Sequence, residues 1–145
     1  MNNNICRFTK IHPNAQIPTK QSELAAGYDL ASIENITIPA HNRILVHTGI
    51  KVALPPQTHL EIRPRSGLAL KHGITVLNSP GTIDADYRGE IMVILINTSD
   101  TDYDIHMGDR IAQAIVMQHL SVTWTETDEL DETSRGSNGF GSTLS

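Results

Sequence analysis

Short β-like runs, each only long enough for a β-strand, recur through most of this sequence and constrain its fold more than any other feature. They lie at residues 43–50, 58–64, 73–78, 89–97, 102–109, 110–118 and 121–127, with Pro, Gly, Asn and Asp between them. In the second run Leu60 and Ile62 alternate with polar residues, which predicts a strand with one buried face. Many short strands separated by turn residues are typical of a β-sandwich or barrel. We therefore expect an all-β fold.

Three stretches need an individual interpretation. "EIMVILIN" (90–97) is apolar almost throughout, which predicts a strand buried on both faces. "RIAQAIVM" (110–117) has the composition of a helix, but it follows a Gly-Asp turn within a β-rich series, so a strand is favoured. "SGLALKHG" (66–73) predicts one short helix, with Ser66 as its N-cap and Gly73 ending it.

The length and net charge of the chain limit its possible functions. The chain has 145 residues, the size of one domain, and 11 Lys and Arg against 16 Asp and Glu give a net charge of -5. This balance gives no electrostatic footprint for nucleic acid, so an anion would bind only at a local site.

A single cysteine, Cys6, indicates a reducing compartment. Without a stretch of transmembrane length or a secretory apolar region, we expect no membrane partner and a cytoplasmic location. The seven histidines show no metal-ligand spacing.

The composition divides the chain into three parts. We expect a β domain at 1–125, an acidic connector at 126–134 and a Gly-rich, mobile C-terminal tail at 135–145. The tail carries Arg135 and Phe140. Such a segment is usually a disordered end, but it can order over a nucleotide, with the arginine on phosphate and the ring stacked on the base.

Four internal stretches could carry chemistry. In "AAGYDLAS", Asp29 is either an exposed turn residue or an anchor for a metal-bound water or a catalytic arginine. In "RPRSGLALKHG", Arg65 and Ser66 precede a helical turn whose free N–H groups suit a phosphate, although a capped helix with solvated arginines fits equally well. In "GDRIAQAIV", Arg110 and Gln113 interrupt an apolar strand. Both residues can be outward polar groups of an edge strand. Alternatively, Gln113 contacts a phosphate or the attacking water.

The fourth stretch, "NSPGTIDADYRGE" (78–90), predicts a β-hairpin. If it is extended, Asp84 and Asp86 share a face. Asp84 lies between two apolar residues, where a carboxylate can serve as general base toward water. Tyr87 offers a flat surface to a sugar or base. The alternative is a hairpin whose turn aspartates are only solvated.

Together with "RGSNGFGST" in the tail, these stretches occur in an order that resembles the five motifs of the trimeric dUTP diphosphatases (dUTPases), from about residue 26 to 143. The resemblance implies a jelly-roll-like β fold of the β-clip type and a homotrimer whose active sites are shared between subunits. It also implies Mg²⁺-dependent hydrolysis of dUTP to dUMP and pyrophosphate, which keeps uracil out of DNA and supplies dUMP for thymidylate synthesis. Asn138 departs from the family's tail, which usually has glycine there.

The resemblance also implies residue roles. Asp84 is the general base that activates water toward the α-phosphorus, and Gln113 and Arg135 complete the catalytic set. Asp29 contacts the metal only through water. The substrate-binding residues are Arg65, Ser66, Gly67, Asn78, Thr82, Ile83, Asp84, Tyr87, Met92, Gln113, Arg135 and Phe140.

Two other functions compete with this one. A dCTP deaminase shares the fold and some motifs but lacks the Gly-rich tail. A non-catalytic trimer that binds nucleotide or protein as a regulator could dispense with Asp84 or Arg135, yet both are present.

Overall fold

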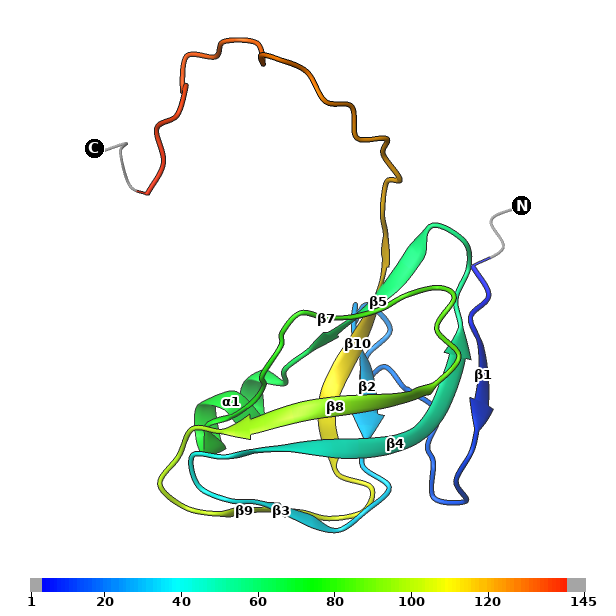
Figure 1. Cartoon of the computed structure of the whole chain (residues 1–145). Coiled ribbons are helices and arrows are strands. Elements are labelled where there is room, and N and C mark those ends of the chain that lie inside the picture. The colour runs from blue at the N-terminus through cyan, green and yellow to red at the C-terminus, as the bar shows by residue number, and fades with distance from the viewer. Residues whose placement is uncertain (1–3, 141–145) are drawn as a thin grey trace.

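The computed structural model describes residues 4–140 (Figure 1). Within them the chain forms ten strands and one helix. They are β1 (Arg7–Lys10), β2 (Tyr28–Ala31), β3 (Ile36–Ile38), β4 (Arg43–Ala53), β5 (Thr58–Arg63), α1 (Ser66–His72), β6 (Ile74–Val76), β7 (Gly81–Ile83), β8 (Glu90–Asn97), β9 (Tyr103–Ile105) and β10 (Arg110–Gln118). The prediction of an all-β chain with one short helix is confirmed.

The strands form two four-stranded sheets and one two-stranded sheet. Their orders are β1-β4-β8-β6, β2-β10-β5-β7 and β3-β9, and the pairs are antiparallel. Figure 1 shows β4 and β8 crossing in front of β10 and β2, with α1 at one end of the body. Sequential strands often lie in different sheets, as in a jelly roll.

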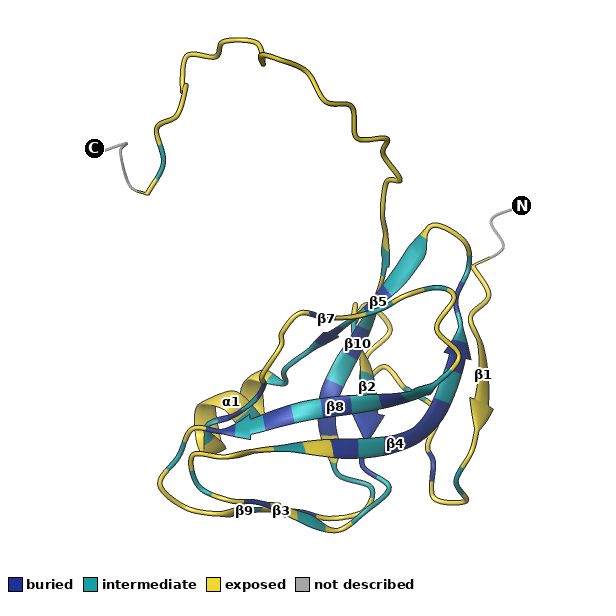
Figure 2. Ribbon diagram, viewed as in Figure 1, coloured by how far each residue is buried: buried dark blue, intermediate teal, exposed yellow. Residues whose placement is uncertain are grey.

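Apolar side chains between the two larger sheets form the core. Leu60 and Ile62 are both buried, which confirms the alternation predicted for β5. Full burial of such a side chain contributes about 1.5–3 kcal/mol. In β8, buried residues alternate with half-buried ones such as Met92 and Ile94 (Figure 2). The prediction that β8 is buried on both faces is therefore wrong, because only one of its faces packs into the core.

The helix begins one residue away from the expected cap. Arg65, with an extended backbone (φ -94°, ψ 126°), is the N-cap, and Ser66 is the first helical residue without a side-chain capping hydrogen bond. Gly73 ends the helix in the left-handed region (φ 66°), and its N–H donates to the Ala69 carbonyl. The predicted end of the helix at Gly73 is thus confirmed, whereas the prediction of Ser66 as N-cap is wrong. The Ser66 hydroxyl is therefore left for other partners.

The stretch 78–90 is not a hairpin between two strands of one sheet. Strands β6 and β8 pair with each other, but the connection between them crosses to the other sheet and forms β7 against β5. Beyond β7, the Tyr87 N–H donates to the Asp84 carbonyl at 3.1 Å and closes a turn. Asp84 and Asp86 therefore lie in a turn rather than on one face of an extended segment.

After Gln118 the described chain contains no further helix or strand. Residues 119–140 arc away from the barrel (Figure 1). The strand predicted at 121–127 is wrong, because its backbone has no neighbouring strand in this chain to bond to. Residues 141–145 of the predicted tail lie outside the described residues. The helix α1, the only one among residues 4–140, is too short to span a membrane.

Candidate functional site

A polar pocket of about 310 Å³ lies where β2, β10 and the start of α1 meet. The loop before β2 closes one side of it. Its lining residues are Gln21, Ala25, Ala26, Gly27, Asp29, Arg65, Ser66, Gly67 and Gln113. The fold therefore brings together three of the stretches that the sequence singled out separately. We call this site the polar pocket.

Asp29 is the anchor of the polar pocket. Its carboxylate, only 12% exposed, lies 3.5 Å from the Arg65 Nε through Oδ1 and accepts a hydrogen bond from the Arg110 Nη1 at 3.2 Å through Oδ2. Arg65 also donates from Nη1 to the Arg110 carbonyl at 2.9 Å. Of the two roles predicted for Asp29, these contacts match the anchoring of an arginine, because both oxygens face guanidinium groups.

Gln113 enters the same pocket from β10. It is level with Asp29 on one neighbouring strand and with Arg63 on the other, and its Nε2 donates to the Pro64 carbonyl at 2.9 Å. A Cβ at Gly27 would lie 2.2 Å from the Gln113 Oε1. Because that distance is shorter than any van der Waals contact, Gln113 can hold this position only opposite a glycine.

The polar pocket has the donors that an anion requires. Arg65 supplies a guanidinium, Ser66 a free hydroxyl, and the first amides of α1 have no partner within the helix. No atom lies within 4 Å of a Cβ built on Gly67, so the backbone there is open to a ligand. Phosphate oxygens match this set of donors.

A second group of predicted residues lies around β7. A narrow cleft of about 40 Å³ is lined by Ile62, Val76, Asn78, Gly81, Thr82, Ile83, Met92, Val93 and Ile94. Asn78 packs closely on Gly81, where an added Cβ would lie 3.1 Å from the Asn78 Nδ2. We call this site the β7 cleft.

Tyr87 lies over Gly89, just beyond the β7 cleft. The Tyr87 hydroxyl donates to the Glu90 carbonyl at 3.0 Å, and a Cβ at Gly89 would lie 2.2 Å from that hydroxyl. The tyrosine is 39% exposed. Its position therefore depends on glycine at 89 and leaves the ring accessible to a ligand.

Asp84 is remote from the polar pocket of its own chain. It follows Ile83, the last residue of β7, which pairs with Leu60, and continuing that register by one residue brings Asp84 level with His59 on β5. At about 3.3 Å per residue, that is about 13 Å along β5 from Arg63, the residue level with Gln113. Asp84 is exposed, so the apolar surroundings predicted for it are not found in the single chain.

The two tail residues are not near either group of side chains. The Arg135 Nε donates to the Asn138 carbonyl within a local turn at 2.9 Å, and Phe140 is fully exposed. Gly136 and Phe140, rather than Asn138, have the left-handed backbone conformation (φ 54° and 50°). The hydrogen bonds within residues 135–140, the part of the tail that the structure describes, thus reach no further than Thr133.

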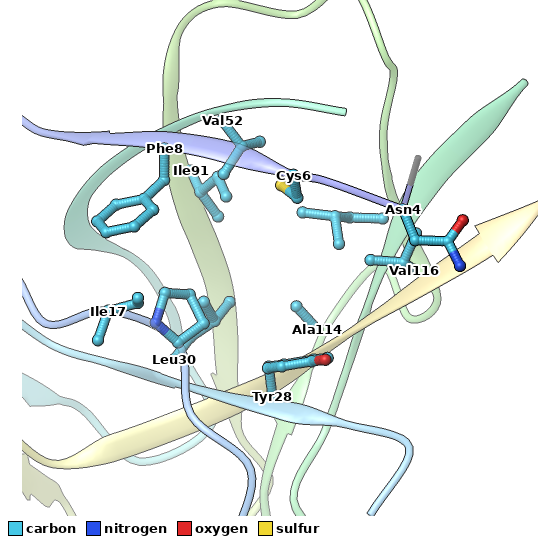
Figure 3. A pocket seen from close by; sticks show the side chains of 12 residues that line it. Asn4, Cys6, Phe8, Ile17, Tyr28, Leu30, Val52, Ile91, Ala114 and Val116 are labelled. Atoms are coloured by element: carbon cyan, nitrogen blue, oxygen red, sulfur yellow. The ribbon is translucent and has the colours of Figure 1, made fainter. Parts of the chain in front are cut away.

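A third cavity, of about 290 Å³, is apolar (Figure 3). Phe8 and Cys6 from the β1 side face Tyr28 and Ala114 across it. Although Cys6 as a whole is exposed, desolvation beside the cavity raises the pKa of its thiol, which disfavours the reactive thiolate. Among the described cavities, the polar pocket and the β7 cleft are therefore the candidates for nucleotide chemistry.

Sequence reasoning gave no role to Gln21 and Gly27, which line the polar pocket, and did not pair Arg110 with Asp29. Arg110 stands out as a polar interruption of an apolar strand, but its partner Asp29 is far away in the sequence. Gly27 and Gln21 carry no local signal of function. The pairing of β2 with β10 brings Asp29 beside Gln113, and the loop before β2 adds Gln21 and Gly27 to the same pocket.

Comparisons with known proteins identify the family. A family model described as dUTPase matches residues 13–144. The deoxyuridine 5'-triphosphate nucleotidohydrolase of Wolinella succinogenes is 57% identical over 137 residues, covering 94% of this chain and 92% of the relative. The enzyme of the same name from Helicobacter pylori strain P12 is 53% identical, covering 94% of both chains.

Solved structures agree on the fold. The Staphylococcus bacteriophage 80alpha dUTPase with dUPNHPP superposes with a TM-score of 0.92 at 23% identity, covering 99% of this chain and all of the other. A mutant dUTPase from phage phi11 of S. aureus, described as coordinating a structural Mg(II) ion, gives a TM-score of 0.83 at 20% identity, covering 89% of this chain and all of the other. The chain belongs to the dUTPase family.

Proposed function

We propose that the polar pocket and the β7 cleft are the two halves of a dUTP diphosphatase active site. As a dUTPase, the chain hydrolyses dUTP to dUMP and pyrophosphate. The observation that carries the residue assignment is the polar pocket, where Arg65 and Gln113 converge beside Asp29 among free amides and a free hydroxyl. These are the groups that a triphosphate needs.

In this proposal the polar pocket binds the phosphates. Arg65 forms a charge-assisted fork to phosphate oxygens, and Ser66 and Gly67 donate from the start of α1. Gln113 contacts phosphate or the attacking water. Asp29 fixes the direction of the Arg65 guanidinium, so the fork is positioned before the substrate arrives.

The polar pocket fits magnesium only through water. Both Asp29 oxygens face arginines, and among residues 4–140 no three His, Cys, Asp or Glu side chains gather around one point. Mg²⁺ prefers oxygen ligands and keeps several waters, so the triphosphate would supply most of its ligands, with Asp29 and Gln113 at the water shell. When bound, the ion would offset phosphate charge.

In this proposal the β7 cleft recognises the uracil base. Asn78 and the backbone at Thr82 and Ile83 hydrogen-bond the uracil edge, and Met92 contacts it from β8. Backbone groups held in β7 cannot reorient, so cytosine, with its donor and acceptor exchanged, leaves buried groups unpaired at about 1–3 kcal/mol each. Tyr87 lies against the deoxyribose, where a 2′-hydroxyl would clash.

Asp84 acts as the general base. Its carboxylate accepts a proton from a water molecule, the water oxygen bonds to the α-phosphorus in line, and the bond to the bridging oxygen of pyrophosphate breaks. Positioning and charge neutralisation dominate phosphoryl transfer, so no covalent protein intermediate is required.

Assembly as a homotrimer brings the two halves together. In one chain Asp84 lies about 13 Å along β5 from the level of Gln113, too far for both to contact the same phosphate. A polar pocket from one subunit and a β7 cleft from the next form a complete site. The extended residues 119–134 carry the tail of a further subunit over it, with Arg135 on the phosphates and Phe140 on the uracil.

We place this activity in the cytoplasm. Cys6 is a free, exposed thiol among the described residues, and the relatives compared above are bacterial enzymes that act on a nucleotide.

Replacement of Asp84 tests the assignment. Asp84→Asn preserves the size of the side chain and removes the base, so kcat for pyrophosphate release from dUTP should fall by about 10²–10⁴-fold with little change in KM. Asp86→Asn, two residues along the same turn, is the matched control and should stay near wild type. Equal rates for wild type and Asp84→Asn would remove Asp84 from this role. Ammonia release from dCTP by the wild type would instead support a deaminase.

A further inference from the structure

Three charged or titratable side chains follow one another along the outer face of β5. His59, Glu61 and Arg63 alternate with the buried Leu60 and Ile62, so they point away from the core. The three side chains are only partly exposed, at 19%, 19% and 41%. They lie outside the polar pocket and the β7 cleft.

A second histidine reaches this row from the end of β10. His119 is the first residue after β10, and its N–H donates to the Gln57 carbonyl at 3.0 Å, just before β5. The His59 Nδ1 lies 3.1 Å from the His119 Nδ1, with the ring centroids 5.2 Å apart and the rings inclined by 41°. Strand β5 and the segment that directly follows β10 thus hold two imidazole nitrogens side by side.

Glu61 determines which nitrogen of His59 is available. Its Oε1 lies 3.5 Å from the His59 Nε2, while its Oε2 accepts hydrogen bonds from the Arg63 guanidinium, including one from Nε at 2.8 Å. A carboxylate beside Nε2 favours the proton on that nitrogen and leaves the Nδ1 lone pair directed toward His119. Metal-binding histidines are commonly oriented in this way by a carboxylate on the opposite nitrogen.

From this geometry we propose that His59 and His119 form a two-histidine site for a divalent first-row transition metal such as Zn²⁺, Ni²⁺ or Cu²⁺. Two nitrogens at about 2.0–2.1 Å from one ion, at a right or tetrahedral angle, lie about 2.9–3.4 Å apart, which matches the observed 3.1 Å. Imidazole suits these ions, whereas Mg²⁺ takes oxygen ligands. Water completes the coordination, and Glu61 orients His59.

The site has a defined place in the fold. His119 begins the extended segment that leads to the tail, so a bound ion would link the start of that segment to β5. The sequence could not indicate the site, because its two ligands are 60 residues apart and show no ligand spacing.

Metal titration of the protein without an affinity tag tests the proposal. We expect calorimetry with ZnCl₂, in the absence of nucleotide, to show one ion per chain, and electron paramagnetic resonance with one equivalent of CuCl₂ to show two equatorial nitrogen ligands. An ion held by a single nitrogen, or no binding of either metal at millimolar concentration, would overturn the site.

Variants separate this site from other histidines. His59→Gln and His119→Gln should each weaken Zn²⁺ binding by more than about tenfold, and Glu61→Gln should weaken it by about 10–100-fold as the loss of an orienting group. His41→Gln, which alters an exposed histidine beside Asp100, is the matched control and should bind like wild type. Retained hydrolysis of dUTP shows that each variant is folded. If a folded His59 or His119 variant binds Zn²⁺ as tightly as His41→Gln does, the two imidazoles share only a proton and the proposal fails.

Discussion

Gly27 positions the Gln113 side chain by having no side chain of its own. The Asp29 and Arg65 motifs could be identified from the sequence, because their residue types suit phosphate chemistry. The contact between Gly27 and Gln113 could not, since it depends on the register of β2 against β10. Residues that act by leaving space carry no chemical signal in a single sequence.

Gly27→Ala should impair catalysis without unfolding the chain. The new methyl would displace the amide end of Gln113, a flexible side chain that can move aside at little cost to stability. We expect kcat/KM for dUTP to fall by about 10–100-fold, equivalent to about 1.4–2.7 kcal/mol. Steady-state pyrophosphate release, alongside the thermal midpoint, would check this. Wild-type kinetics would show that the position of Gln113 does not matter.

At the scale of elements, strands that carry a recognisable run between turn residues could be predicted, and strands without such a run could not. The sequence indicated the long strands β4, β5, β8 and β10, and its runs at 73–78 and 102–109 also indicated the short strands β6 and β9. Strands β1 and β3 have only four and three residues, and β1 is exposed throughout, so pairing with β4 and β9 determines them. At 121–127 a run of the same kind gave a wrong prediction, because a strand requires a partner as well as a pattern.

A charged pair stabilises the irregular part of β4. The register with β8 shifts between His47 and Lys51, and the Glu90 carboxylate accepts hydrogen bonds there from the His47 Nδ1 at 2.9 Å and the Gly49 N–H at 2.8 Å. The hydrogen bond to Glu90 raises the pKa of His47 above its ordinary 6.5. Burial acts to raise the pKa of Glu90, but the bonds from His47 and Gly49 outweigh it and leave that pKa lowered from 4.5.

This pair predicts a pH-dependent stability. The His47 contribution is fully present below pH 6.5 and is lost as pH rises through the raised pKa, and the Glu90 contribution is lost as pH falls through its lowered pKa. His47→Gln should therefore cost more at about pH 6 than at about pH 9, by under about 1 kcal/mol because the histidine is accessible to water. Urea unfolding at fixed protein concentration would measure it. An equal cost at both pH values would contradict the coupling.

The tail element has a separate test. Deleting residues 135–145 should lower kcat by at least about tenfold and leave the proposed trimer intact, because residues 135–140 lie away from both sheets (Figure 1). An arginine finger contributes about 10³–10⁵ in GTPases, and the presence of Arg65 makes us expect less here. Arg135→Ala in the full chain should account for most of the loss. Dissociation of the oligomer on truncation, measured by light scattering, would count against a lid.

For the whole molecule, the distance between the polar pocket and the β7 cleft is the decisive feature. The sequence motifs indicated both groups of residues, but motifs in chain order do not show which copy of the chain completes a site. That assignment depends on β5 separating β10 from β7.

Mixed assemblies test whether sites are shared. Arg65→Ala damages the polar pocket and Asp84→Asn damages the turn after β7, so each variant alone should be nearly inactive. Co-refolding them in equal amounts should restore about a quarter of wild-type activity, because a random trimer pairs an intact half from each variant at one site in four. Each variant refolded alone is the control. No recovery in trimers proven by mass spectrometry to be mixed would mean that both halves come from one chain.

The same distance has a consequence for how much enzyme a cell must make. If neither half can turn over dUTP without the other, a newly synthesised chain is inert until it meets its partners. Turnover per chain would then rise with total chain concentration and fall on dilution below the dissociation constant of the assembly. When expression decreases, total activity would then fall more steeply than the amount of protein.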